Sequence, residues 1–322
     1  MIEIYQNHVD GVVRRAADCD IALTQAGLVW IDLDEPTSAE EERVETALGI
    51  EVLTTKERSA MEESARFYEE NGALYLTTTL LGRRDEGPFR SGPVTFVLTA
   101  DGVLVTVRHI NPRAFEIGEG RASARIARAR GGGDVMVALI EGCVERISDV
   151  LQESTASAHA LSAEIFTDDA GDAPDLPTSL RTLGRLGTLA ALAHDSLSSL
   201  HRAVVFAAAT KPDARGLASA RLNALRRDIE QLERAIEAFQ AHLTYVQEAI
   251  LGLVNAAQSN TLKALSLATI AFVPPTLIAS VFGMNFEAMD WFREPWGPWA
   301  GFLLMLIAPA ALFGIAKWRR WF

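Results

Sequence analysis

Two long stretches near the C-terminal end of the chain are apolar and uncharged. They cover residues 264–285 and 295–316, and neither contains Asp, Glu, Lys or Arg. Each is long enough to cross a bilayer as a helix, which needs about 20 residues. Core helices of soluble proteins are seldom this long and uncharged, and tryptophans gather at the edges of the second stretch, as in an aromatic belt. The pattern predicts two membrane-spanning helices joined by a short loop.

The charged residues beside these stretches predict their orientation. The outer flanks carry the basic residues Lys263, Lys317, Arg319 and Arg320. The loop at 286–294 carries the acidic residues Glu287, Asp290 and Glu294. Because positive flanks stay in the cytoplasm, both termini are expected there, and the N-terminus lacks the pattern of a signal peptide. We therefore expect a multi-pass protein of the inner (plasma) membrane whose large N-terminal part is cytosolic.

Upstream of the first stretch, apolar residues recur at spacings of three and four. This apolar stripe consists of Leu222, Leu225, Ile229, Leu232, Ile236, Phe239, Leu243, Val246, Ile250, Leu253 and Ala257. No proline occurs between Pro212 and Pro274, so we predict one helix from about Pro212 to about Phe282, about 100 Å long. The stripe predicts helix–helix packing, either within one chain or between chains.

A second stripe follows a different face of the same helix and carries hydroxyl groups. It consists of Asn255, Ser259, Leu262, Ser266, Thr269, Val273, Thr276, Ser280 and Gly283. Small hydroxyl residues also serve close packing in membranes, but a whole polar face favours a water-lined pore. Since one helix cannot enclose a pore, this hydroxyl face predicts several copies around an axis. Pro274 and Pro275 fit the same assembly, because the backbone groups they leave unpaired need neighbours or water.

The N-terminal part of the chain alternates strand and helix patterns. Residues 27–34 read as a buried strand, and two hairpins are predicted about Asn71-Gly72 and Asp101-Gly102. Helices are expected at 38–49 and between residues 134 and 210. The fold class is therefore α+β (α/β), a sheet with helices packed on it.

These patterns divide the chain into five parts. They are a cytosolic α/β domain at 1–133, a helical hairpin at 134–211, a stalk helix continuing into the first membrane helix at 212–285, an external acidic loop at 286–294, and the second membrane helix with its basic tail at 295–322.

The composition excludes several functions. The chain carries 30 Lys and Arg against 42 Asp and Glu, a formal charge of −12, which argues against a nucleic-acid binder. Within this acidic chain, Arg121, Arg125, Arg128 and Arg130 are predicted to form a solvated helix face rather than an anion site.

No other segment indicates enzymatic chemistry or a cofactor. Cys19 and Cys143 are far apart and are expected to be reduced, partly buried thiols. The histidines show no metal-ligand spacing, and no nucleophile stands beside a base. The three glycines at 131–133 lack the lysine of a phosphate-binding loop and are predicted to be a linker.

The first apolar stretch ends in Gly283-Met284-Asn285, and through this motif the chain resembles the CorA family of divalent-cation transporters. The context matches as well, because a proline-containing uncharged helix precedes the motif and an acidic loop, a last span and the tail KWRRWF follow it. The resemblance is strongest over 255–322. Residues 93–109, PVTFVLTADGVLVTVRH, look like the cytosolic domain of the family's ZntB-like branch.

The resemblance implies a homopentameric funnel in which five copies of the first membrane helix line the pore. Asn285 would form a ring of amide oxygens at the outer mouth, with Gly283 letting the chain turn and Met284 holding the ring. The remaining expected pore positions are Ser259, Leu262, Leu265, Ser266, Thr269, Val273, Thr276 and Ser280, with Glu248 at the cytosolic vestibule. Regulatory cation sites between cytosolic domains are implied too, with Asp228 as a possible ligand.

Together these features predict channel-like Mg²⁺ uptake driven by the membrane potential. Mg²⁺ holds its water reluctantly, and a neutral amide ring can hydrogen-bond the hydrated ion without stripping it. Met284 favours Mg²⁺, but transport of Zn²⁺, Co²⁺ or Ni²⁺, with or without protons, is the alternative that the ZntB-like branch suggests. A membrane-anchored coiled-coil scaffold or sensor would explain the spans and the apolar stripe, but not the hydroxyl face or Asn285.

Overall fold

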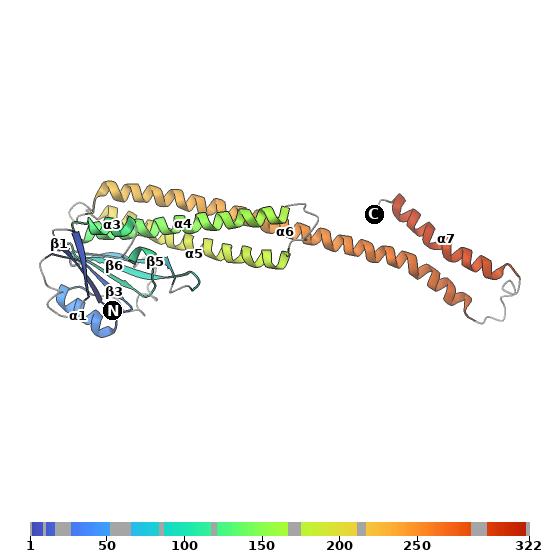
Figure 1. Cartoon of the computed structure of the whole chain (residues 1–322), viewed down its shortest axis with the longest axis horizontal. Coiled ribbons are helices and arrows are strands. Elements are labelled where there is room, and N and C mark those ends of the chain that lie inside the picture. The colour runs from blue at the N-terminus through green and yellow to red at the C-terminus, as the bar shows by residue number, and fades with distance from the viewer. Residues whose placement is uncertain are drawn as a thin grey trace. The chain divides into compact units, whose positions relative to one another are not determined.

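The computed structural model describes most of the chain (Figure 1). The described residues are 2–8, 11–16, 27–51, 66–83, 87–116, 121–166, 175–210, 217–284 and 295–319. The chain separates into two compact units, Met1–Val246 and Gln247–Phe322. The predicted site residues Asn285, Glu287, Asp290 and Glu294 lie outside the described residues, as does Cys19.

The first unit is built on a seven-stranded sheet in the order β2-β1-β3-β7-β6-β5-β4. Its strands are β1 (Ile2–His8), β2 (Gly11–Ala16), β3 (Leu28–Asp34), β4 (Phe67–Glu70), β5 (Ala73–Gly82), β6 (Arg90–Leu98) and β7 (Leu104–Arg108). Only the central β3–β7 pair is parallel, and the other pairs are antiparallel. The expected mixed α/β fold is present, with β1 and β2 as strands that the sequence patterns did not predict.

The hairpin turn predicted at Asn71-Gly72 and the helix predicted at 38–49 both form. Asn71 and Gly72 both have positive φ, 49° and 79°, which is the backbone of the two-residue hairpin turn between β4 and β5. Helix α1 (Ser38–Leu48) starts with a capping box in which the Thr37 hydroxyl accepts from the Glu40 backbone N–H and the Glu40 carboxylate accepts from the Thr37 backbone N–H. It ends at Gly49, which has a φ of 63°.

A buried ion pair joins the two parallel strands. Arg108 Nη2 lies 3.0 Å from Asp32 Oδ2, and the two side chains are 7% and 1% exposed. Thr106 donates its hydroxyl to Asp32 at 2.6 Å and accepts the Trp30 indole N–H at 2.8 Å. Burial raises the pKa of Asp32, while Arg108 acts in the opposite direction. The carboxylate is therefore held by specific partners that link β3 to β7.

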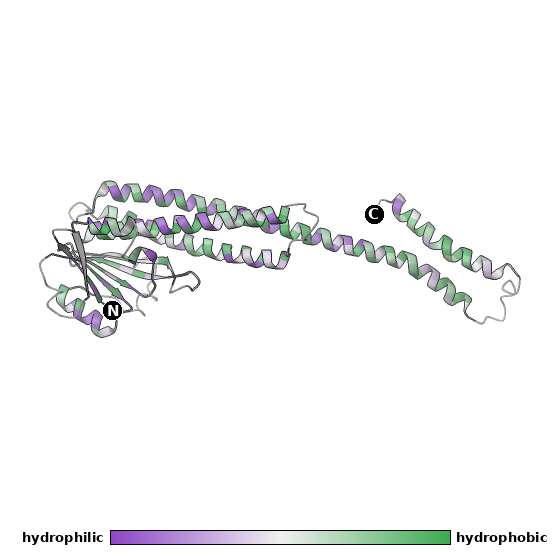
Figure 2. Cartoon of the chain, viewed as in Figure 1, coloured by the Kyte–Doolittle hydropathy of each residue, from purple (hydrophilic) through white to green (hydrophobic). Residues whose placement is uncertain are grey.

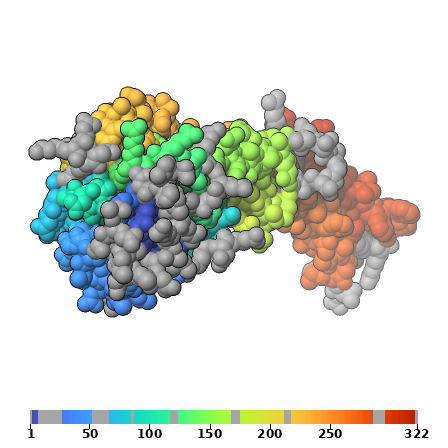
Figure 3. Space-filling model, turned by 60° about the vertical axis from the view of Figure 1, so that its left-hand side comes forward, coloured from blue at the N-terminus to red at the C-terminus, as the bar shows by residue number. Residues whose placement is uncertain are grey.

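Helices α4 (Gly132–Phe166) and α5 (Leu176–Ala209) pack side by side on the sheet (Figures 1 and 3). Strand β4 is too short to pair with the whole of β5. Two serines of α5 continue the ladder instead, because Ser199 Oγ accepts the Thr79 N–H at 2.8 Å and Ser196 Oγ accepts the Leu81 N–H at 3.1 Å. Helix α5 thereby covers the part of the β5 edge that β4 leaves unpaired.

The glycines at 131–133 do not form the predicted linker. Gly132 and Gly133 open α4, and a Cβ on Gly132 would lie 2.6 Å from the Gly102 carbonyl oxygen and closer still to the Leu104 nitrogen. Gly132 N–H also donates to Gly102 O at 2.8 Å. Gly132 lets α4 begin directly against the β6–β7 turn, because no side chain would fit at that position.

Helix α6 (Ser219–Phe282) begins seven residues later than predicted from Pro212. The residues just before it, Leu217 and Ala218, are not helical, and Leu217 is completely buried. The side chain of Leu217 therefore lies in the core before the helix starts. From Ser219 onward, α6 is continuous through Pro274 and Pro275.

The apolar stripe packs within the chain. Its buried members are Leu222, Leu225, Ile229, Ile236, Phe239, Leu243, Val246 and Ile250, whereas Leu253 and Ala257 are exposed. Side chains of α6 meet both α4 and α5, as in the ring contact between His159 and His242 and the ion pair between His201 and Glu233. The stripe therefore serves a three-helix layer in its first part and has no partner within the described chain after Ile250.

The second unit contains the rest of α6 and helix α7 (Gly297–Trp318). Both helices are long and apolar enough to cross a membrane, and Figure 2 shows them as the most continuously hydrophobic part of the chain. None of the hydrophobic window of α6 is buried, and only 11% of that of α7 is. Their apolar surface is therefore left for lipid or for other copies of the chain.

Candidate functional site

The predicted pore residues lie on one face of α6 and are exposed in the chain. They are Ser259, Leu262, Leu265, Ser266, Thr269, Val273, Thr276 and Ser280, with Glu248 further toward the N-terminus on the same face. At about 100° per residue, the eight positions from Ser259 to Ser280 fall within about 120° of the helix circumference. This is a face distinct from the buried stripe.

Two threonines of this hydroxyl face donate their hydroxyl protons to backbone carbonyls of α6 itself. Thr269 donates to the Leu265 carbonyl oxygen at 2.9 Å, and Thr276 donates to the Phe272 carbonyl oxygen at 2.7 Å. Each hydroxyl oxygen still has acceptor lone pairs that can point away from the helix. The face therefore offers hydrogen-bond acceptors, which suit the water shell of a cation.

The proline pair adds two more acceptors in the middle of the first membrane helix. Neither Pro274 nor Pro275 has a backbone N–H, so the carbonyls of Ile270 and Ala271 receive no helical hydrogen bond from them. In lipid such groups must be satisfied by a neighbour or by water. The helix is continuous through both prolines, so the freed carbonyls stay within the first membrane helix.

The Gly283-Met284-Asn285 motif begins directly after the last residue of α6. Gly283 N–H donates to Ala279 O at 2.9 Å, and Met284 N–H donates to Val281 O at 3.3 Å. Among the described residues the glycines with positive φ are Gly27, Gly49, Gly72 and Gly102, so helical hydrogen bonding continues through Gly283 without a left-handed turn there. The Met284 side chain is 57% exposed. Asn285 itself lies outside the described residues.

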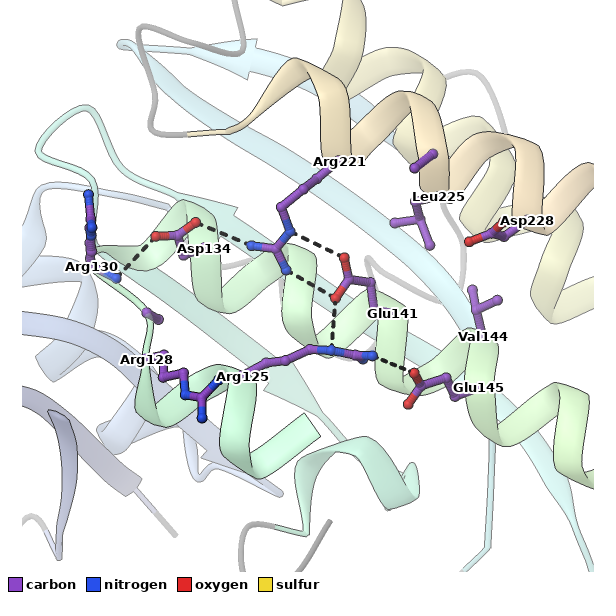
Figure 4. Close-up of a pocket in the computed structure, with 12 residues that line it drawn as sticks. Arg125, Arg128, Arg130, Asp134, Glu141, Val144, Glu145, Arg221, Leu225 and Asp228 are labelled. Carbon is purple, nitrogen blue, oxygen red and sulfur yellow. Dashed lines mark hydrogen bonds and ion pairs between the residues drawn. The ribbon is translucent and has the colours of Figure 1, made fainter. Parts of the chain in front are cut away.

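A cleft of about 540 Å³ is lined by charged residues of α3 (Arg121–Ala127), α4 and α6 and of the segment between α3 and α4 (Figure 4). Arg221 lies 3.0 Å from Glu141 and 3.3 Å from Asp134, and Arg125 lies 2.6 Å from Glu145. The hydrogen bond to Glu145 raises the pKa of Arg125. The expectation of a solvated arginine face is thus wrong for Arg125, because carboxylates of α4 pair with it.

This charge pairing leaves few carboxylates in the cleft that could bind a cation. Asp228, the candidate regulatory ligand, lines the cleft, but the three other carboxylates of the lining are already paired with arginines. Among the described residues no group of three or more His, Cys, Asp and Glu could hold a metal ion. Among the residues that the structure describes, Asp228 therefore lacks the further ligands that a cation site needs.

Sequence spacing missed two histidine contacts, because their partners come from different helices. His201 of α5 lies 3.2 Å from Glu233 and 3.8 Å from Glu230, both on α6. The rings of His159 and His242 are 5.0 Å apart between centroids. No pattern within one helix indicates such pairs, which tie α4 and α5 to α6.

A family model described as "CorA-like Mg2+ transporter protein" matches residues 25–318. The chain is 30% identical to "Magnesium transport protein CorA" of Yersinia pestis over 300 residues, which covers 92% of each chain. It is 29% identical to the protein of the same name from Escherichia coli (strain K12) over 293 residues, covering 91% of this chain and 92% of the relative.

Solved structures show the same fold. The structure of the CorA magnesium transporter from Methanocaldococcus jannaschii superimposes with a TM-score of 0.72 at 17% identity, covering 98% of this chain and 97% of that one. The ZntB cytoplasmic domain from Vibrio parahaemolyticus gives a TM-score of 0.57 at 11% identity, over 79% of this chain and 98% of that one. The likeness to ZntB therefore concerns the fold of the cytosolic part.

Proposed function

Because this chain belongs to the family of CorA-like Mg²⁺ transporter proteins, we propose that it carries Mg²⁺ into the cytosol through a pore lined by the second half of α6. The observation that carries this proposal is the exposed hydroxyl face. Thr269 and Thr276 present acceptor oxygens from a helix that is otherwise apolar enough for a membrane. Such a face is costly against lipid and favourable against water.

The pore requires several copies of the chain, and the family resemblance points to a homopentamer. Support comes from the second unit, whose helices bury almost none of their surface within the chain. Lipid can cover the apolar faces of α6 and α7. The hydroxyl faces of neighbouring copies would instead surround a common axis, with Ser280 toward the outer mouth and Glu248 toward the cytosol.

The ion passes in hydrated form in this proposal. Mg²⁺ gives up water reluctantly, so a path of amide and hydroxyl oxygens suits it better than carboxylates, which would bind it too tightly for rapid release. Asn285 provides the amide ring at the mouth, and Glu287, Asp290 and Glu294 raise the cation concentration outside it. A divalent ion gains about 4.6 kcal/mol on entering across 100 mV, so the potential alone can drive uptake.

In this proposal, apolar residues of the same face close the pore. Leu262, Leu265 and Val273 are 63%, 64% and 55% exposed in the single chain. Rings of these side chains would exclude water when the helices approach one another. Binding of cations between cytosolic units would then stabilise the closed state, if their affinity for that state is higher.

Mg²⁺ is preferred over Zn²⁺, Co²⁺ or Ni²⁺ because the relatives similar over nearly the whole chain are named magnesium transport proteins. The test is ion flux into liposomes containing the purified protein, with a negative-inside potential and Mg²⁺, Zn²⁺, Co²⁺ or Ni²⁺ outside. We expect potential-driven Mg²⁺ entry that changes in rate or selectivity in Asn285→Ala. Entry of Zn²⁺ alone, or only with a proton gradient, would favour the alternative ion. Absence of all ion flux would favour the alternative of a membrane-anchored scaffold or sensor.

A further inference from the structure

In the described part of the chain, helix α7 buries only small residues. The buried residues of α7 are Gly297, Gly301 and Ala316. The large residues beside them face outward, with Trp299 74% and Phe302 63% exposed.

One side chain of α6 fills the space that Gly301 leaves. A Cβ on Gly301 would lie 3.3, 3.5 and 3.7 Å from the Cε1, Cδ1 and Cζ atoms of Phe282. The first distance is tighter than most real Cβ contacts, so the Phe282 ring would have to move. Phe282 is the last residue of α6 and directly precedes Gly283 and Met284.

We propose that Gly301 is a positioning residue that fixes the outer end of the pore helix by receiving the edge of the Phe282 ring. This inference rests on the proposed function, because it gives a role in ion entry to a residue outside the hydroxyl face. Gly283 and Met284 hydrogen-bond back to Ala279 and Val281. Because Phe282 is bonded directly to Gly283, a shift of the Phe282 backbone by the pressed ring would move the start of the motif with it.

The chain provides a matched control on the same helix. Gly314 also lies in α7, and a Cβ there would meet nothing within 4 Å in the chain. Changing either glycine to alanine or leucine alters helix propensity and apolar volume alike. Only the changes at Gly301 press on Phe282.

The experiment measures Mg²⁺ entry into liposomes as a function of external Mg²⁺, which separates the half-saturating concentration from the maximal rate. We expect Gly301→Ala to raise the half-saturating concentration about threefold and Gly301→Leu about tenfold, because positioning errors well below 1 Å weaken a preorganised site. The same changes at Gly314 should leave it within about twofold. Combining Gly301→Ala with Phe282→Leu should bring the value back toward wild type, since the smaller side chain relieves the contact.

Equal shifts at Gly301 and Gly314, a fall in maximal rate alone, or strict additivity of the Gly301 and Phe282 changes would overturn this role while leaving the proposed function standing. Wild-type liposomes that carry no Mg²⁺ would overturn both. If Gly301→Leu does not assemble, as judged by size-exclusion chromatography, the alanine series decides the question. A general loss of folded protein would lower the maximal rate and would not change the half-saturating concentration.

Discussion

Thr276→Val tests the hydroxyl face most directly. The change keeps the shape of the side chain and removes only the hydroxyl group, which donates to Phe272 O at 2.7 Å and leaves its oxygen free to accept from water. Thr276 lies in the uncharged part of α6, directly after the proline pair. Valine there would present a methyl group to the passing hydrated ion, and the barrier to entry should rise.

The expected size of the effect follows from the hydrogen bond that is lost. One hydrogen bond to a water of the ion's shell contributes about 1 kcal/mol, which corresponds to about a fivefold change in rate. If five symmetry-related hydroxyls contacted the shell at once, the loss would approach 5 kcal/mol, or between three and four orders of magnitude. We therefore expect the maximal Mg²⁺ rate to fall at least about fivefold, with the higher value as an upper bound.

The assay is stopped-flow entry of Mg²⁺ into dye-loaded liposomes at a fixed negative-inside potential. Thr261→Val is the matched control, because Thr261 is an exposed threonine of α6 that makes the same kind of bond, to Ala257 O at 3.0 Å, but lies off the hydroxyl face. Its rate should stay within about twofold of wild type. Equal rates for Thr276→Val and wild type, or equal losses in both variants, would refute the assignment of this face to the pore.

Three further predictions concern the cytosolic unit. Ser199→Ala should destabilise it by about 1 kcal/mol in thermal or denaturant unfolding, because the half-buried backbone N–H of Thr79 in β5 loses its acceptor; half-buried Ser198→Ala is the control and should change little. Arg108→Met should cost about 3–5 kcal/mol by leaving the Asp32 carboxylate buried without its partner, and adding Asp32→Asn should recover part of that loss; a loss as large in the double variant would contradict the pairing. Burial raises the pKa of Cys143 to about 12, so in a variant whose other cysteine is serine, maleimide labelling of folded protein should stay slow as the pH rises from 7 to 9.5. Since the unfolded thiol ionises near its ordinary pKa and the folded one does not, stability should also fall as the pH rises above about 9; rapid labelling of the folded protein would show that the thiol is accessible.

The local elements were predictable because their signals lie within a few residues of one another. The hairpin at Asn71-Gly72, the capped helix α1 and the apolar stripe of α6 each follow from short-range preferences that the fold does not override. Strands β1 and β2 were missed. The start of α6 was placed too early, because Leu217 and Ala218, which the structure shows as non-helical, carry no local signal that ends a helix.

The candidate pore face was readable from the sequence for a related reason. Helix geometry alone fixes which residues of α6 share a face, so Ser259 to Ser280 could be grouped without coordinates. The order of the motif, the acidic loop and the second span is linear information as well. The number of copies is not encoded in any one helix, and it stays a prediction.

Contacts between distant segments could be decided only by the tertiary structure. Nothing near Ser199 in the sequence indicates that its hydroxyl completes the edge of β5, and nothing near Gly301 indicates that it receives the ring of Phe282. Arg125 illustrates the same limit, since its pairing with Glu145 depends on how α3 lies against α4. The chain by itself determined periodicity, charge and turns because these act over a few residues. Packing decided the partners, because complementary side chains meet only once the sheet and the helices have come together.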